Sequence, residues 1–344
     1  MSDSTFDEIM SSITSELTGD PEHDYAYLVE TSEQYKDHPL AQEILRAVGR
    51  LLCDVLPPDV RDEIFQYLDN NMAAGTSVLD EATFQAKSGN IKKALEILEP
   101  YAHKLQEDAE SGLFADDSVN CYFNYDDSFQ QLLLELILQP EKTIRPAMLP
   151  FTRTFALLGG ILYEDHRHDE AITWLERAIK WNPTDCGSYF EIAENYKVKK
   201  DFDQAEIWHD KAYPFLATPT DLARWYRAKG FCAIERGELE LAAAEFMVSL
   251  AYEPSQLAMS EILYIKMQYG EDYTNMDMDQ AVFVVSNHEL PIGPAEEVVD
   301  AWIIFYKLAT ANEQNDLAEH CLKMLVALTH DEDFYDMPAL SPNE

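Results

Sequence analysis

The chain has 344 residues, and its 64 acidic side chains outnumber 25 basic ones, which gives a formal net charge of −39. This excess of carboxylates opposes binding to phosphate backbones and to anionic lipid surfaces, so we expect no nucleic acid and no membrane as a partner. Hydrophobic residues make up 47% of the chain, which excludes global disorder, and no apolar run is long enough to cross a bilayer.

Two further features favour a cytoplasmic location. The five cysteines are dispersed and form no Cys-x-x-Cys pair, which is typical of reduced thiols that fill a core. The first residues contain no basic stretch followed by an apolar core, so no secretory signal is visible.

The sequence of the N-terminal part, residues 1–74, has the pattern of paired helices but lacks a repeated spacing. Its helical patterns cover 5–18, 24–35 and 40–56. Pro57 and Pro58 then interrupt the chain, and Asp59 is placed to cap a further helix that ends near Asn70. We expect this part to form an atypical cap on whatever follows.

The next two segments differ sharply from each other. Residues 75–108 have the spacing of a helix pair, carried by Ala82, Ala94 and Leu98. Residues 109–151 are irregular: an acidic, aromatic stretch precedes an apolar helix at 129–138, and Pro140, Pro146 and Pro150 follow. We expect this insertion either to pack on an outer surface or to lie across a groove.

Residues 152–270 contain one spacing three times. Four positions that are 12, 7 and 5 residues apart hold Gly159, Ala171, Ala178 and Pro183, then Ala193, Ala205, Ala212 and Ala217, then Gly230, Ala242, Ser249 and Pro254. An aromatic residue stands four positions before each opening small residue: Phe155, Tyr189 and Tyr226. Small residues let crossing helices approach closely, so the pattern predicts three antiparallel helix pairs, and a helix over 256–269 seals the last one.

The C-terminal part, residues 271–344, is predicted to hold a helix over 277–287, a Leu290-Pro-Ile-Gly-Pro connection and a degenerate helix pair that begins at Ala295. An acidic tail follows from His330 and is expected to fray. No stretch shows the alternation of a strand, and the chain is predicted to be all-α.

The central spacings resemble those of the tetratricopeptide repeat (TPR) family, whose period of 34 residues separates the first two units. With the weaker flanking copies the resemblance covers about half of the chain. It implies a right-handed superhelix of antiparallel helix pairs, a TPR-like α-solenoid, with non-repeat helical caps. The overall layout is similar to that of uncharacterised bacterial TPR proteins. His209 replaces an apolar residue of the pattern, and we expect it to be buried with its ring hydrogen bonded.

The resemblance also implies which side chains face the concave surface. These include bases and aromatic residues in each central unit: Arg153, Tyr163, Phe190, Lys197, Arg224, Arg227 and Phe231. They predict a mildly basic, aromatic groove that would bind an extended or helical peptide carrying acidic side chains or a carboxylate. The alternative is that Arg153, Arg224 and Arg227 only form ion pairs with acids on neighbouring repeats.

No catalytic motif is found, neither a phosphate-binding glycine loop nor a Gly-x-Ser-x-Gly sequence. His166 and His168 form the densest cluster of ligand-type residues, but two ligands do not complete a metal site. We therefore predict a non-enzyme without cofactor or metal: a cytoplasmic adaptor or scaffold that binds a protein or peptide. The alternative is a self-associating structural protein, a homo-oligomer included, whose groove is filled by its own or a neighbour's segment.

Overall fold

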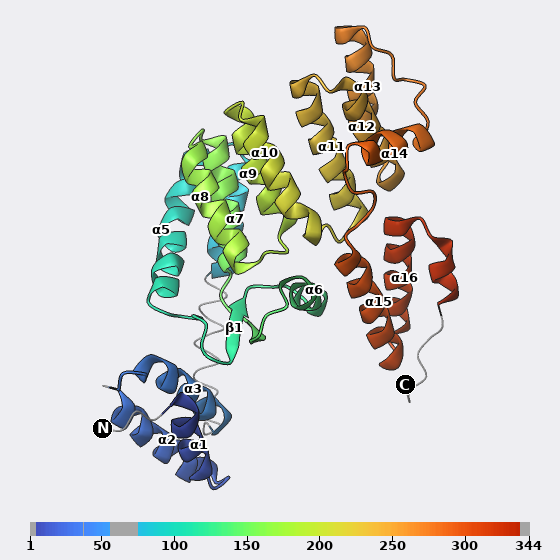
Figure 1. Ribbon diagram of the computed structural model, residues 1–344. Coiled ribbons are helices and arrows are strands. Elements are labelled where there is room, and N and C mark those ends of the chain that lie inside the picture. Colours follow the sequence, from blue (N-terminus) through green and yellow to red (C-terminus); the bar gives the residue numbers. More distant parts are fainter. Residues whose placement is uncertain (1–4, 37, 56–74, 338–344) are drawn as a thin grey trace.

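The computed structural model describes residues 5–36, 38–55 and 75–337 (Figure 1). The predicted helix from Asp59 to Asn70 and the end of the acidic tail lie outside these residues. The N-terminal part consists of three helices, α1 (Phe6–Ser15), α2 (Pro21–Tyr35) and α3 (Ala41–Val55). They enclose a core of their own, made of Ile9, Ile13, Leu28, Ile44 and Val48.

The predicted stack of antiparallel helix pairs is confirmed. An early pair joins the helical residues 75–87 to α5 (Ile91–Glu110). The three central pairs are α7 (Phe151–Glu164) with α8 (His168–Trp181), α9 (Cys186–Val198) with α10 (Phe202–Ala212), and α11 (Pro219–Arg236) with α12 (Leu239–Tyr252). Figure 1 shows these pairs following one another along the molecule.

The small residues lie where the paired helices cross, as their spacing predicted. A Cβ atom added to Gly159 would lie 2.5 Å from Leu175 Cγ and 3.2 Å from the carbonyl oxygen of Ala171. A Cβ atom at Gly230 would lie 3.1 Å from the ring of Phe246, and Ala193 has no exposed surface. The backbones can therefore pack at these crossings only because the side chains there are absent or minimal.

The insertion holds two short strands that the sequence did not predict. β1 (Asn120–Phe123) pairs in parallel with β2 (Thr143–Pro146), and α6 (Ser128–Leu138) connects them. Each strand has four residues, too few for an alternating pattern to show in the sequence. Leu134 of α6 is fully buried between the strands' Cys121 and Ile144, which fixes the helix on this small sheet.

The insertion is attached at the end of the stack where α8 ends and α7 begins. The Asn124 backbone N–H donates to the Trp181 carbonyl oxygen over 2.7 Å, and the Asn124 side chain accepts from the Thr152 N–H over 2.9 Å. The Asn182 side chain donates to Gln130 of α6. The segment thus lies over the beginnings of the inner helices.

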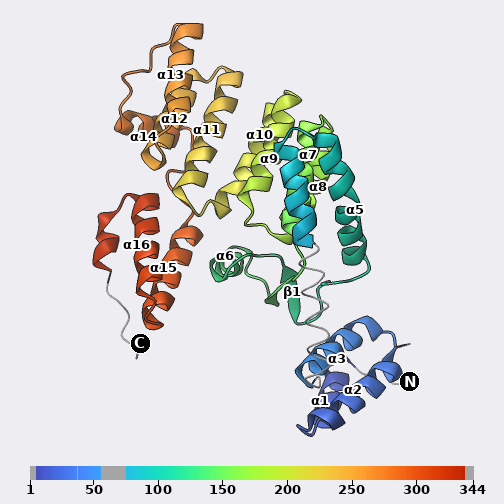
Figure 2. The same ribbon diagram turned by 180° about the vertical axis from the view of Figure 1, so that it is seen from behind.

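The C-terminal helices are α13 (Gln256–Tyr269), α14 (Met278–Asn287), α15 (Glu296–Ala311) and α16 (Asn315–Thr329), followed by the short turn η2 (Glu332–Asp336). The chain between α14 and α15 returns to α11, where the Tyr226 hydroxyl donates to the Pro291 carbonyl and accepts from the Gly293 N–H. The last pair therefore folds back beside α6 and the start of α11, whereas α13 stays at the outer end (Figures 1 and 2).

His209 is buried as expected, but its ring is not satisfied. Neither ring nitrogen has a hydrogen-bond partner, and burial together with the nearby Lys229 charge lowers the histidine pKa to about 3. The ring packs edge-on against Phe190. His209 is therefore neutral at physiological pH and serves as a core side chain.

Candidate binding cleft

Each basic residue predicted to line the concave face forms an ion pair with an acidic side chain. Arg153 lies 3.5 Å from Asp80. Arg224 of α11 pairs with Glu191 of α9 over 3.4 Å, and Arg227 of α11 pairs with Glu253, which directly follows α12, over 2.8 Å. Lys197 forms an ion pair with Glu194 over 2.8 Å. The three arginines thus form ion pairs, Arg153 and Arg224 with acidic residues of the preceding repeat and Arg227 with one of its own repeat.

The aromatic residues of this face are covered to different degrees. Phe190 is only 2% exposed, because the guanidinium of Arg224 from the next inner helix lies over its ring at 4.4 Å. This corrects the expectation that Phe190 is open to the groove. Phe231 is half-buried beneath the Lys197 ammonium at 4.1 Å, and Tyr163 is half-buried against His168. Little free aromatic surface is left between the paired charges.

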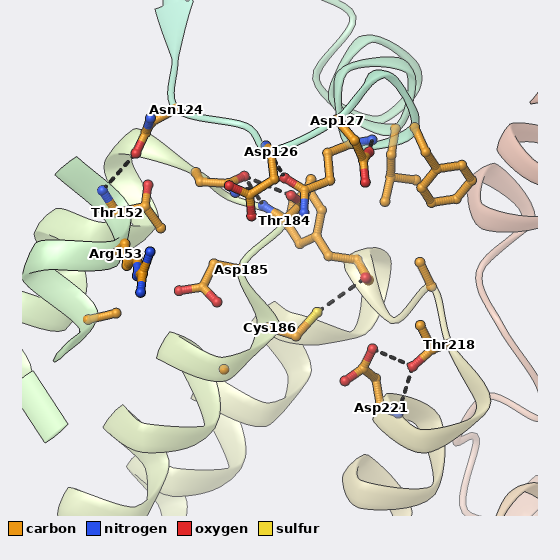
Figure 3. Close-up of a pocket in the computed structure, with 18 of the residues that line it drawn as sticks. Asn124, Asp126, Asp127, Thr152, Arg153, Thr184, Asp185, Cys186, Thr218 and Asp221 are labelled. Atoms are coloured by element: carbon orange, nitrogen blue, oxygen red, sulfur yellow. Dashed lines mark hydrogen bonds between the residues drawn. The ribbon is translucent and has the colours of Figure 1, made fainter. Parts of the chain in front are cut away.

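A cleft of about 1050 Å³ lies at the end of the stack where α7, α9 and α11 begin. Its lining comes from distant stretches of sequence: Thr76 of the early pair, the insertion, the starts of the inner helices with the connections before them, and α15 with α16. Figure 3 shows Asp126 approaching from the insertion, Asp185 from the start of α9 and Asp221 from the start of α11. The fold thus joins side chains here that are far apart in the chain.

Four carboxylates line this cleft, and none of them forms an ion pair with a described base: Asp126, Asp127, Asp185 and Asp221. Three accept hydrogen bonds from neutral groups at helix starts. Asp127 accepts from the Gln130 N–H over 2.9 Å, Asp185 from the Ser188 hydroxyl over 2.5 Å, and Asp221 from the Thr218 hydroxyl over 2.6 Å. These hydrogen bonds occupy only part of each carboxylate's capacity.

The electrostatic balance of the cleft is negative. The beginnings of α6, α7, α9 and α11 each contribute a partial charge of roughly +0.5, about half of what would offset four carboxylates. The basic lining residues are Arg153, which is paired with Asp80, and His320. Burial raises the pKa of Asp185, and the negative charge of Asp126 adds to that rise. Asp185 thus lacks a compensating cation.

Aromatic side chains form another part of the lining. Phe129 of α6 stacks on Trp302 of α15 with ring centroids 3.9 Å apart, and Phe305 meets Phe129 edge-on at 5.5 Å. The Trp302 indole N–H donates to the Ala217 carbonyl over 3.0 Å, which fixes the wall to the base of the cleft. The lining therefore combines acidic side chains with a rigid cluster of aromatic ones.

The lining contains no activated nucleophile. Cys186 is buried between Asp185 and Asp221, and its thiol donates to the Phe215 carbonyl oxygen over 3.1 Å. Burial and these two carboxylates raise the pKa of the thiol well above its usual range. Cys186 therefore stays protonated and fills space.

In the described part of the chain, the cleft included, no group of three or more His, Cys, Asp or Glu residues has the geometry to hold a metal ion. In the polar turn singled out from the sequence, His168 Nδ1 lies 2.9 Å from the Asn195 side-chain oxygen. Cys121, Cys186, Cys232 and Cys321 are free and buried. Within the same residues, every helix is too short or too polar to span a bilayer.

Comparisons with known proteins give structural likeness alone. No family model matches the chain, and no curated protein is significantly similar to it. Among solved structures, the C-terminal part of a TPR repeat-containing protein from Cytophaga hutchinsonii aligns with 75% of this chain and 98% of its own, at 16% identity and a TM-score of 0.31. BtubC (BKLC) from P. vanneervenii aligns with 74% of this chain and 88% of its own, at 15% identity and a TM-score of 0.25. The assignment of the fold rests on the helix pairs described above.

Proposed function

We propose that this chain is a cytoplasmic scaffold without catalytic activity that binds a partner protein by a cationic segment, which inserts lysine or arginine side chains into the cleft. The observation that carries this proposal is the set of four carboxylates without described basic partners, which line a cleft of about 1050 Å³ together with aromatic side chains. Asp185 and Asp221 are half-buried, whereas Asp126 and Asp127 are exposed. A half-buried carboxylate without a counter-charge is unfavourable, and an incoming cation would offset that cost at Asp185 and Asp221.

The two kinds of lining side chain suit the two ends of a long basic side chain. Phe129 and Trp302 are buried and Phe305 is half-buried, so the aliphatic stem of lysine or arginine would contact chiefly Phe305 while its charged head reaches the carboxylates. A guanidinium could form two parallel hydrogen bonds with a single carboxylate and also stack on an aromatic ring. Arginine should therefore bind more tightly than lysine.

The charge of the whole chain supports the same class of partner. A net charge of −39 attracts a basic segment at long range and accelerates its association, and salt screens this attraction. An acidic peptide on the concave face would meet the opposite situation. It would have to displace Glu191 from Arg224 and Glu253 from Arg227 while the rest of the chain repels it.

Binding of labelled peptides of equal length tests the proposal. An arginine-rich, a lysine-rich and a glutamate-rich peptide, each with one aromatic residue, are titrated with the protein and followed by fluorescence anisotropy at low and high salt. We expect the arginine-rich peptide to bind best, the lysine-rich one next, and both to weaken as salt rises. Preferential binding of the glutamate-rich peptide would instead favour the basic groove predicted from the sequence.

A further inference from the structure

Helix α13 exposes an unusual number of large apolar side chains. Six of its 14 residues are of this kind, and they are between 44% and 78% exposed: Leu257, Met259, Leu263, Tyr264, Met267 and Tyr269. Met267 is the most exposed of them. Isolated exposed apolar residues are ordinary, but a contiguous group on one helix marks a surface that another chain covers.

The path of the chain explains why this face is open. Ala258, Ile262 and Ile265 are buried, and they pack α13 against α12 in the way that the first helix of a fourth pair would pack. The second helix of such a pair is not supplied by the following residues. They form a loop and then α14, which packs on α12 through Ala281 and Val285. The side of α13 that a pairing helix would cover therefore faces solvent.

The open face is also free of acidic side chains. Its exposed residues are Gln256, Leu257, Met259, Ser260, Leu263, Tyr264, Lys266, Met267, Gln268 and Tyr269. The acidic residue of this helix, Glu261, is half-buried. Lys266 forms an ion pair with Asp272 over 2.7 Å. In a chain of net charge −39, most surfaces repel a second copy, and this face provides a place where two copies can approach without opposing carboxylates.

The apolar stripe on this face is symmetric along the helix. Met259, Leu263 and Met267 are spaced four residues apart, so they share one side of the helix, with Ser260 next to them. Two such helices placed antiparallel about Leu263 bring Met259 of each onto Met267 of the other, with the two Leu263 side chains in contact. A self-complementary stripe is what a two-fold interface requires.

We propose that two copies of this chain associate through α13, antiparallel and centred on Leu263, so that each copy supplies the pairing helix that the other lacks. This interface is separate from the cleft and does not depend on the function proposed for it. A stable interface usually buries about 800 Å² on each partner, more than one helix face provides, so the dimer should be weak and concentration-dependent. Flexible methionine side chains suit such a contact.

Salt distinguishes this association from binding in the cleft. Screening reduces the repulsion between two acidic chains, so added salt should strengthen the dimer, whereas it should weaken the binding of a cationic peptide. Sedimentation velocity over a micromolar concentration series, at low and at high salt, measures the effect directly. We expect the average mass to rise toward that of two copies with concentration, and more steeply at high salt.

Two substitutions make the test specific. Leu263→Glu places a charge at the centre of the stripe and should leave the protein monomeric. Ile207→Glu on α10 changes a residue of similar exposure, 44% against 47%, and should leave the dimer unchanged. Circular dichroism checks that both variants are folded. A monomer throughout the series, or a Leu263→Glu variant that associates as well as the unaltered chain, would overturn the proposal.

The antiparallel arrangement has its own test. Met259→Cys and Met267→Cys variants are treated with a short bis-maleimide, separately and as a mixture, with the unaltered chain as the background. The proposal predicts that the mixture yields more cross-linked dimer than either variant alone. Equal or greater cross-linking of each variant with itself would contradict the antiparallel arrangement.

Discussion

Charged side chains form ion pairs on the concave face of the central pairs, whereas the carboxylates of the cleft at the starts of the inner helices form none with a described basic residue. On the concave face, Arg153, Arg224 and Arg227 each meet an acid from a neighbouring element. In the cleft, Asp126 and Asp185 have no described basic partner. Paired charges already have their partners within the fold, whereas unpaired charges in a cleft are available to a binding partner. The comparison shows that the location of bases alone does not identify a binding surface.

The largest expected effect comes from breaking the stack that creates both regions. Gly159→Ala adds a Cβ atom within 2.5 Å of Leu175 Cγ in a closed core, so we expect the free energy of unfolding to fall by about 1–3 kcal/mol. Gly160→Ala on the same helix is the matched control, because no atom lies within 4 Å of its added Cβ. That change should stabilise the protein by about 0.5–1 kcal/mol. Urea denaturation of both variants measures the difference, and equal effects would refute close packing at Gly159.

The second-largest effect is expected from neutralising two carboxylates of the cleft. Asp185→Asn together with Asp221→Asn retains oxygen acceptors for Ser188 and Thr218 but removes two negative charges. Hydrogen bonds to charged groups are worth about 1.5–3 kcal/mol each, so affinity for an arginine-rich peptide should fall roughly tenfold or more. Isothermal titration calorimetry gives the affinity, and thermal melting confirms the fold. Unchanged affinity in the folded variant would remove the cleft from consideration.

An unpaired acid inside the array should affect stability and not binding. Glu245 of α12 is buried with one oxygen unpartnered, and burial raises its pKa to about 8. The folded chain keeps this proton up to about pH 8, whereas the unfolded chain loses it near its ordinary pKa of 4.5. Between these values the folded state holds more protons, so this group makes stability fall as pH rises, by up to about 1.4 kcal/mol per pH unit.

Glu245→Gln should therefore stabilise the protein at alkaline pH and flatten the decline, with little effect near pH 4.5. Glu240→Gln, an exposed position on the same helix, is the control and should change little. Melting temperatures measured over a pH series test whether the substitution flattens the decline in stability. Parallel profiles for the unaltered chain and the Glu245→Gln variant would show that this carboxyl does not carry the pH dependence.

The smallest effect is expected on the concave face. Arg224→Gln removes an ion pair whose side chains are about 40% exposed, and such pairs contribute roughly 0–1 kcal/mol to stability. Because Arg224 lies outside the cleft, the affinity for an arginine-rich peptide should stay within about twofold. Its replacement also uncovers Phe190. A large gain or loss of peptide binding in this variant would place the binding surface on the concave face after all.

The stack could be predicted from the sequence because a helix crossing restricts the size of one side chain at a fixed interval. Gly159, Ala193 and Gly230 show that restriction directly in the sequence. The strands could not be predicted, since Asn120–Phe123 depends on a partner more than twenty positions away. The burial of His209 followed from the repeat pattern, but its unsatisfied ring did not, because hydrogen-bond partners depend on atomic positions.

The cleft required the three-dimensional arrangement as well. Phe129, Asp185 and Trp302 lie in three separate segments, and the return of the chain to Tyr226 brings the last of these into place. One signal was present in the sequence: aspartates stand at or just inside the starts of α6, α9 and α11. Aspartate is common at helix starts, so each of them is unremarkable singly and nothing in the sequence showed that they meet.

The most direct test of the central claim is to observe the cleft while a cationic segment binds. Trp302 lies in its wall, whereas Trp174, beneath Arg177 on α8, does not line it. In protein labelled with fluorotryptophan, and assigned by substitution of each tryptophan, titration with the arginine-rich peptide should shift the fluorine resonance of Trp302 and leave that of Trp174 in place. An unmoved Trp302 resonance at saturating peptide, or a shift produced only by the glutamate-rich peptide, would contradict the account.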